Sequence, residues 1–123
     1  LQVELGALPF AQWEGADGPA PEPSSTVRER VARARALQLG RQGVPNARLG
    51  PERTRALAEP EAAGRRLLEE AAQRGALSPR DLDRVLRAAL TAADLAGARR
   101  PAREHVAEAL QYRAFDRGAV CSR

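Results

Sequence analysis

The spacing of apolar residues changes along the chain. The first five residues alternate between apolar and polar, which is the period of a β-strand. No partner strand follows, and a lone strand is not stable. We therefore expect residues 1–5 to be the end of a strand from a preceding domain. Residues 6–23 are rich in Gly, Pro and Ala, with only Phe10 and Trp13 to pack, so they predict a mobile linker.

A helical period begins near Thr26. Thr26 and Glu29 have the spacing of a capping box, which predicts a first helix from Val27 to Gln42 that ends before Gly43. Its arginines fall largely off the apolar positions, so we expect an apolar stripe that faces a core. That stripe consists of Val27, Val31, Ala34 and Leu37.

Proline and glycine mark the next two helical segments. Gly50 and Pro51 open a short helical turn, and Pro60 suits the first position of a longer helix that Gly75 closes. The apolar residues of this longer helix are Leu67, Leu68, Ala71 and Ala72.

Two more helices complete the pattern. Ser78 followed by Pro79 is a strong helix start, and Asp81 lies in the first turn of the helix, which runs to Gly97. Pro101 opens the last helix. The core-facing residues are Leu82, Val85, Leu86, Ala89 and Ala93 in the former, and Val106, Ala109 and Leu110 in the latter. We predict an all-α fold: a four-helix bundle over residues 24–117, with a short tail at 118–123.

Charged residues are distributed unevenly along the chain, and arginine is the only basic residue type apart from one histidine. All 20 basic residues are arginine, against 16 acids, for a net charge of +4. The first 26 residues hold four acids and no base, so the rest of the chain is strongly basic. Such a surface suits phosphate, although an arginine-rich, lysine-free composition is also typical of GC-rich genomes.

The residue inventory argues against an independent enzyme. A phosphate loop needs a lysine, and there is none. His105 and Cys121 have no partner at a catalytic or metal-binding spacing, so we expect a structural role for His105. The single cysteine fits a reducing cytosol, no apolar run is long enough to cross a membrane, and we expect a cytoplasmic protein. Because the chain begins at Leu1 and contains no Met, we expect it to be a fragment.

The sharpest local signal is the helix start at Ser78. Its cap places Arg80 in the first turn, where backbone amides and the positive end of the helix dipole favour an anion. A guanidinium there can bind phosphate through two hydrogen bonds. The same pattern also fits an ordinary surface ion pair, so these residues alone leave both interpretations open.

A longer series of residues resembles the magnesium-chelatase-like AAA+ ATPases of the ComM/YifB type. The series runs through Ser24-Ser25, Val27-Arg28, Arg30-Val31, Ala34-Arg35, Gln38, Gly43, Asn46, Ser78, Arg80, Arg84, Thr91, Ala93, Asp94, Leu95, His105, Glu108, Ala109, Tyr112 and Arg113. Two positions depart from the family pattern. Leu90 stands where the family usually has Arg, and Pro23 where it usually has Glu.

The resemblance implies a function for the fold. It implies the C-terminal helical lid of a ring-forming, hexameric ATPase, in which Arg80 is the sensor-2 residue, Ser78 caps its helix and Arg84 is a second candidate ligand. ATP and Mg²⁺ would be held by the core domain, and we expect this chain alone to bind neither tightly. The implied partners are its own core domain, neighbouring subunits and DNA undergoing branch migration. The alternatives are a helix-turn-helix module that binds nucleic acid and a purely structural bundle.

Overall fold

The computed structural model describes residues 1, 3, 6–7, 20–75 and 77–118, of which 114–118 are described for their backbone alone. The helices are α2 (Ser24–Gln42), α3 (Pro51–Leu57), α4 (Ala62–Gln73), α5 (Pro79–Ala96) and α6 (Arg103–Gly118), with a 3₁₀ turn at Asn46–Arg48. No strand occurs in these ranges, which confirms the all-α prediction. The predicted strand remnant at 1–5, linker at 6–23 and tail at 118–123 fall largely outside the described residues.

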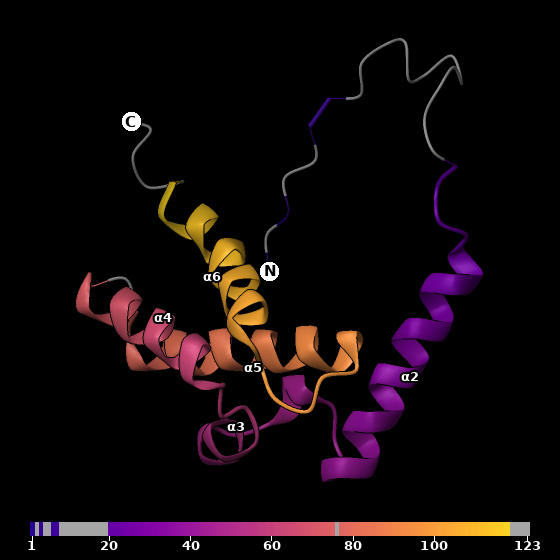
Figure 1. The fold of residues 1–123 in the computed structure, drawn as a ribbon, viewed down its shortest axis with the longest axis horizontal. Helices are drawn as coiled ribbons and strands as arrows, with labels where there is room; N and C mark the ends of the chain where they lie inside the picture. The colour runs from indigo at the N-terminus through magenta and orange to yellow at the C-terminus, as the bar shows by residue number, and fades with distance from the viewer. Residues whose placement is uncertain (2, 4–5, 8–19, 76, 119–123) are drawn as a thin grey trace.

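Helix α5 lies at the centre of the bundle. It packs against α6, α2 and α3, while α4 packs on α6 (Figure 1). Four of the five predicted core-facing residues, Val85, Leu86, Ala89 and Ala93, are buried, and Leu82 packs at the margin of the core. Leu90, which the helical period did not mark as core-facing, is buried as well, with 1% of its surface exposed. The core cluster consists of Leu49, Ala58, Leu68, Val85, Leu86, Ala89, Leu90, Val106 and Ala109.

Both ends of α5 form as the sequence predicts. At the start, the Ser78 hydroxyl accepts a hydrogen bond from the backbone N–H of Asp81, and the Asp81 carboxylate accepts one from the backbone N–H of Ser78. This reciprocal pair is a capping box, which satisfies two backbone amides at the helix start. At the other end Gly97 adopts φ +71°, a left-handed conformation that glycine takes without steric cost.

The predicted start of α2 is wrong. The helix begins at Ser24, after an extended Pro23 that carries no side-chain cap. The backbone N–H of Thr26 donates to the carbonyl of Pro23, so Thr26 already lies inside the first turn and cannot cap it. The carbonyl of Pro23 accepts the first hydrogen bonds of the helix, from the backbone N–H groups of Thr26 and Val27, which places the helix start three residues earlier than the capping-box pattern suggested.

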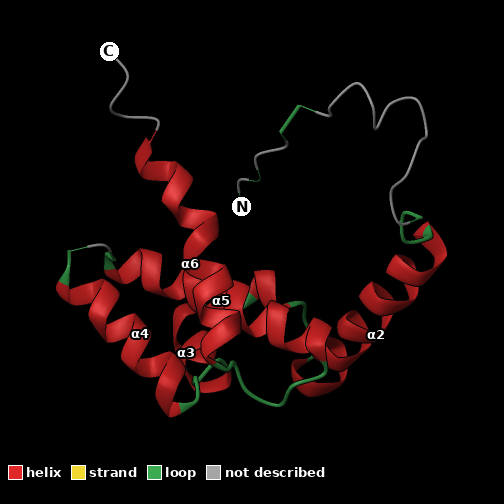
Figure 2. Cartoon of the chain, turned by 45° about the horizontal axis from the view of Figure 1, so that its top comes forward, coloured by secondary structure: helices red, strands yellow, loops and turns green. Residues whose placement is uncertain are grey.

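The predicted core stripe of α2 is also wrong. Val31 and Leu37 are 51% and 52% exposed, and Val27 is exposed as well. The buried residues are instead Ala34, Gln38 and Gln42. Only the C-terminal part of α2 lies against the bundle, and the remainder extends away from it (Figure 2). Of the predicted stripe, only Ala34 faces the core.

A polar network replaces apolar packing where α2 meets α5. The guanidinium of Arg41 donates to both carboxylate oxygens of Asp94, at 2.7 and 3.0 Å, and Asp94 has only 2% of its side chain exposed. The buried amide of Asn46 donates to Asp94 and to Thr91, and accepts from Arg41 and Gln42. One buried amide therefore joins α2, the 3₁₀ turn and α5.

The start of α4 differs from the prediction by two residues. Pro60 is buried ahead of the helix, Glu61 is the cap residue and the helix begins at Ala62. The backbone N–H of Glu61 donates to the carbonyl of Pro101 at 2.9 Å, which ties the chain before α4 to the chain before α6. A few residues later α4 approaches α6 closely at Gly64, where an added Cβ would lie 3.1 Å from Cγ2 of Val106.

Candidate functional site

Arg80 lies in the first turn of α5, directly after Pro79 at the first helical position. Its side chain is exposed, and no hydrogen bond or ion pair joins its guanidinium to any residue that the structure describes. The surface ion pair that the sequence left open as its alternative role is therefore not formed within this part of the chain. The guanidinium is available to a ligand or to another polypeptide.

The capping box that fixes Arg80 also changes the expected electrostatics. Asp81 uses its carboxylate as a cap, and its own backbone N–H is bonded to Ser78. A negative charge thus lies at the helix start, and one of the amides that the sequence offered to an anion is already engaged. We therefore expect guanidinium groups, more than backbone amides, to attract an anion to the start of α5.

Arg113 of α6 provides one of those guanidinium groups. Its Nη1 lies 2.6 Å from Oδ1 of Asp81, and its side chain is only 22% exposed. Arg113 first, and the hydroxyl of Ser78 second, hold the pKa of the Asp81 carboxyl well below its usual value. Because the folded-state pKa is lowered, the pair stabilises the fold above the unfolded-state pKa, and this contribution is lost on acidification through the folded-state pKa.

Sequence reasoning placed Arg113 only within the family-like series and gave it no role at the site. Arg113 follows Asp81 by 32 positions, and no local pattern links residues that far apart. The pair forms because α6 packs along α5 and brings Arg113 next to Asp81.

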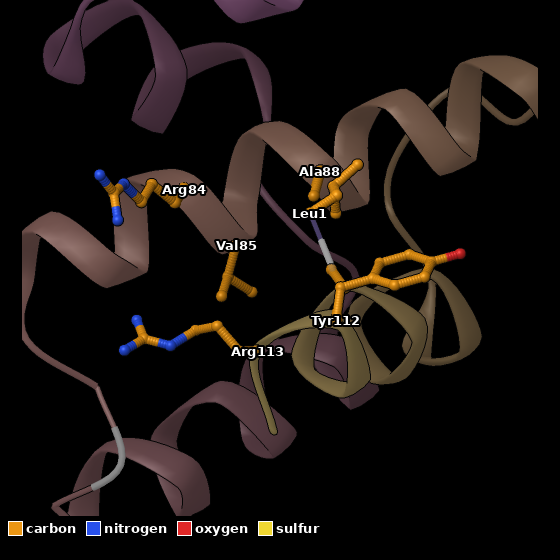
Figure 3. A pocket seen from close by; sticks show the side chains of 7 residues that line it. Leu1, Arg84, Val85, Ala88, Tyr112 and Arg113 are labelled. Atoms are coloured by element: carbon orange, nitrogen blue, oxygen red, sulfur yellow. The ribbon is translucent and has the colours of Figure 1, made fainter. Parts of the chain in front are cut away.

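Arg84 lies one turn after Arg80 on the same helix. It is exposed and, like Arg80, has no hydrogen bond or ion pair among the described residues. It lines a cavity of about 440 Å³ between α5 and α6, together with Arg113. Figure 3 shows the two side chains extending in the same direction along the cavity. The structure thus brings Ser78, Arg80 and Arg84 to one end of α5, and adds Arg113 from α6.

Arg87, one turn further along, has a different role. Its guanidinium donates to the backbone carbonyls of Asp83, Leu49 and Ala47, at 3.2, 3.4 and 3.5 Å. It therefore ties α5 to the 3₁₀ turn. Arg66, an exposed and unpartnered arginine of α4, is the better matched control for a substitution at Arg80.

The only histidine is structural, as predicted. His105 is buried, and its Nδ1 accepts a hydrogen bond from the backbone N–H of Ala102 at 3.0 Å, which caps the start of α6. Over the described ranges, no cluster of three or more His, Cys, Asp or Glu side chains could hold a metal ion. Over the same ranges, none of the helices is both long and apolar enough to cross a membrane. Cys121 lies outside the described residues.

Residues 21–113 match the family described as the C-terminal region of magnesium chelatase subunit ChlI. The match covers α2 to α5 and α6 as far as Arg113, and it includes the site at the start of α5. No solved structure has a significant match to this chain.

Curated bacterial proteins are similar over most of the chain. Competence protein ComM of Haemophilus influenzae is 37% identical over 120 residues, which are 95% of this chain and 23% of that protein. An uncharacterized protein of Mycobacterium tuberculosis is 38% identical over 117 residues, or 92% and 23% of the two chains. The uncharacterized protein YifB of Escherichia coli is 38% identical over 96 residues, or 78% and 19%. The chain thus spans less than a quarter of the length of these relatives.

Proposed function

Because this chain belongs to the family of C-terminal domains of magnesium chelatase subunit ChlI, we propose that it is the helical lid of a ring-forming AAA+ ATPase of the ComM/YifB type. In this proposal Arg80 is the sensor-2 residue, which reaches the γ-phosphate of ATP bound by the core domain. Arg84 is a second candidate ligand, and Ser78 fixes the helix that carries both.

One observation carries the assignment of Arg80: an exposed, unpartnered guanidinium at a rigid, capped helix start. A guanidinium stabilises the negative charge that develops on the transferred phosphoryl group, and it does so best when its position is fixed beforehand. The core domain supplies the phosphate loop and Mg²⁺. Loss of the γ-phosphate then releases Arg80, and the lid moves relative to the core.

The proposed partners follow from the family and from the chain's charge. The lid would contact its own core domain and neighbouring subunits of a hexamer. One relative is named a competence protein, and the ComM-like resemblance favours a motor for branch migration of DNA in the cytoplasm. The arginine-rich composition, +4 overall, suits an assembly that works on phosphate-bearing partners.

The helix-turn-helix alternative has weaker support. A recognition helix must present one long face to DNA. Here the corresponding helix is α5, which is surrounded by α2, α3 and α6 and buries residues along its length from Asp83 to Asp94. The part of α5 that remains exposed near its start is short and carries Arg80 and Arg84.

Replacing Arg80 by Ala in the intact ATPase tests the proposal. We expect turnover to fall by a factor on the order of 10², as for loss of one preorganised donor at the reacting centre. Folding should be unchanged, because the side chain is exposed and makes no hydrogen bond or ion pair with a described residue. Steady-state ATP hydrolysis at saturating ATP and Mg²⁺ is the measurement, with assembly checked by light scattering.

Arg66→Ala is the matched control, since it removes the same charge from an exposed, unpartnered position on α4. It should leave turnover nearly unchanged. Equal rates for wild type and Arg80→Ala, at equal assembly, would falsify the sensor assignment.

A further inference from the structure

The cavity between α5 and α6 has two chemically different ends. Its volume of about 440 Å³ is within the range of small-molecule sites. Arg84 and Arg113 lie at one end, and Tyr112, Ala88 and Leu1 lie at the other (Figure 3). The full lining is Leu1, Arg84, Val85, Ala88, Ala109, Tyr112 and Arg113, which includes two guanidinium groups and no carboxylate.

The two guanidinium groups differ in how they are held. Arg113 is fixed by its ion pair with Asp81, and Asp81 is fixed in turn by the capping box. A guanidinium has five N–H donors, more than one carboxylate that also serves as a helix cap can satisfy. The buried Nη1 of Arg113 has no well-aligned hydrogen bond despite its short contact with Asp81. Arg84 has no partner at all among the described residues.

The other end of the cavity suits a flat apolar group. Val85, Ala88 and Ala109 are apolar residues of the lining, and Figure 3 shows the ring of Tyr112 at the same end of the cavity as Ala88. The hydroxyl of Tyr112 donates to Glu108 at 2.6 Å, which holds the ring in place. Aromatic rings of this kind stack on nucleobases irrespective of base identity.

We propose that this cavity binds one nucleotide unit, with its phosphate on Arg84 and Arg113 and its base against Tyr112. The choice of a nucleotide rests on the proposed function, but the site does not require Arg80 to be the sensor. The proposal adds Arg113 of α6 to the phosphate-binding groups. Asp81 then acts as a positioning residue, because its carboxylate holds the guanidinium of Arg113. The nucleotide unit can come from a free nucleotide or from a single strand of nucleic acid.

The test uses the 123-residue chain in solution, with ¹⁵N resonances of arginine side chains and ¹H resonances of the tyrosine ring. Pyrophosphate should shift the Nε–H signals of Arg84 and Arg113 saturably. ATP should shift these and also the Tyr112 ring, with affinity in the millimolar range, because neither a phosphate loop nor Mg²⁺ contributes. An oligodeoxythymidylate represents the single strand of nucleic acid. Whichever of ATP and the oligomer binds with the higher affinity shows whether the site prefers a free nucleotide or a strand.

Arg84→Gln should weaken binding by about tenfold, as expected for loss of one charge-assisted contact. Arg84→Gln should fold normally, because the Arg84 side chain makes no hydrogen bond or ion pair with a described residue. Arg113→Gln also breaks the ion pair with Asp81, so it serves only as a supporting variant, and it should weaken binding too. Arg66→Gln removes the same charge elsewhere and should bind like wild type.

Two results would overturn the proposal. The first is an equal loss for Arg84→Gln and Arg66→Gln, which would mean nonspecific attraction to a basic chain. The second is a Tyr112 ring that neither ATP nor the oligomer shifts, which would remove the base from the cavity. Both are separate from failure of the lid assignment, which is judged by turnover of the Arg80→Ala ATPase.

Discussion

Helices α2 and α5 have nearly the same length, 19 and 18 residues, but they are stabilised differently. Helix α5 begins with a capping box and buries a continuous apolar face at the centre of the bundle. Helix α2 begins without a side-chain cap, exposes most of its large apolar residues and docks through glutamines and an ion pair. A regular apolar spacing therefore predicts a helix, but it does not by itself predict which face is buried.

The largest expected difference between the two helices concerns their leucines. Leu90 of α5 is 1% exposed, so Leu90→Ala should lower the free energy of unfolding by about 2–5 kcal/mol through lost burial and a cavity. Leu37→Ala in α2 should change it by less than about 0.5 kcal/mol, since that side chain is half exposed. Urea denaturation followed by circular dichroism measures both. A comparable loss for the two variants would show that the apolar stripe of α2 is covered in solution.

The next largest effect concerns the polar attachment of α2. Asn46→Ala should cost about 2 kcal/mol, because it removes one hydrogen bond from the buried carboxylate of Asp94 and one from the buried amide of Gln42. The loss should be local: hydrogen exchange should show reduced protection in the C-terminal half of α2 while α5 stays protected. Gln73→Ala, at an exposed amide of α4, is the control and should have no such effect. Uniform loss of protection across both helices would contradict a separate attachment of α2.

The smallest of the three effects compares the two helix starts. Ser78→Ala removes the cap of α5 and should cost about 1 kcal/mol, or a fall in melting temperature of roughly 4 °C. Thr26→Ala in α2 removes no cap and should leave the melting temperature within about 2 °C of wild type. Thermal unfolding of the two variants side by side is sufficient. If Thr26→Ala lowers the melting temperature as much as Ser78→Ala does, Thr26 caps α2 as the sequence suggested.

Most of the fold follows from local signals. The central helix was predictable because its cap, its apolar period and its terminal glycine all agree, from Ser78 to Gly97. The errors fell where distant groups decide. The start of α4 depends on a hydrogen bond to Pro101, and the buried face of α2 depends on Asp94, 53 residues after Arg41. Nothing in a single helical segment encodes such partners.

The candidate site divides in the same way. Ser78 and Arg80 lie within one turn, so their spacing was enough to predict a capped helix start with an arginine in it. The ion pair of Asp81 with Arg113 depends on the packing of α6 along α5, and no spacing rule would have found it. The sensor role of Arg80 remains a prediction from the family resemblance.

The close approach at Gly64 has a mechanical consequence. An added Cβ there would lie 3.1 Å from the side chain of Val106 in α6 and 3.5 Å from the backbone of Ala102 in the loop before α6, so the backbone of α4 lies very close to α6 and its preceding loop. Because Gly64 places no side chain of α4 between the two helices at this point, they have little room to slide, and packed interiors transmit strain. A displacement of α6 should therefore move α4 with it, instead of being taken up by sliding between the two helices.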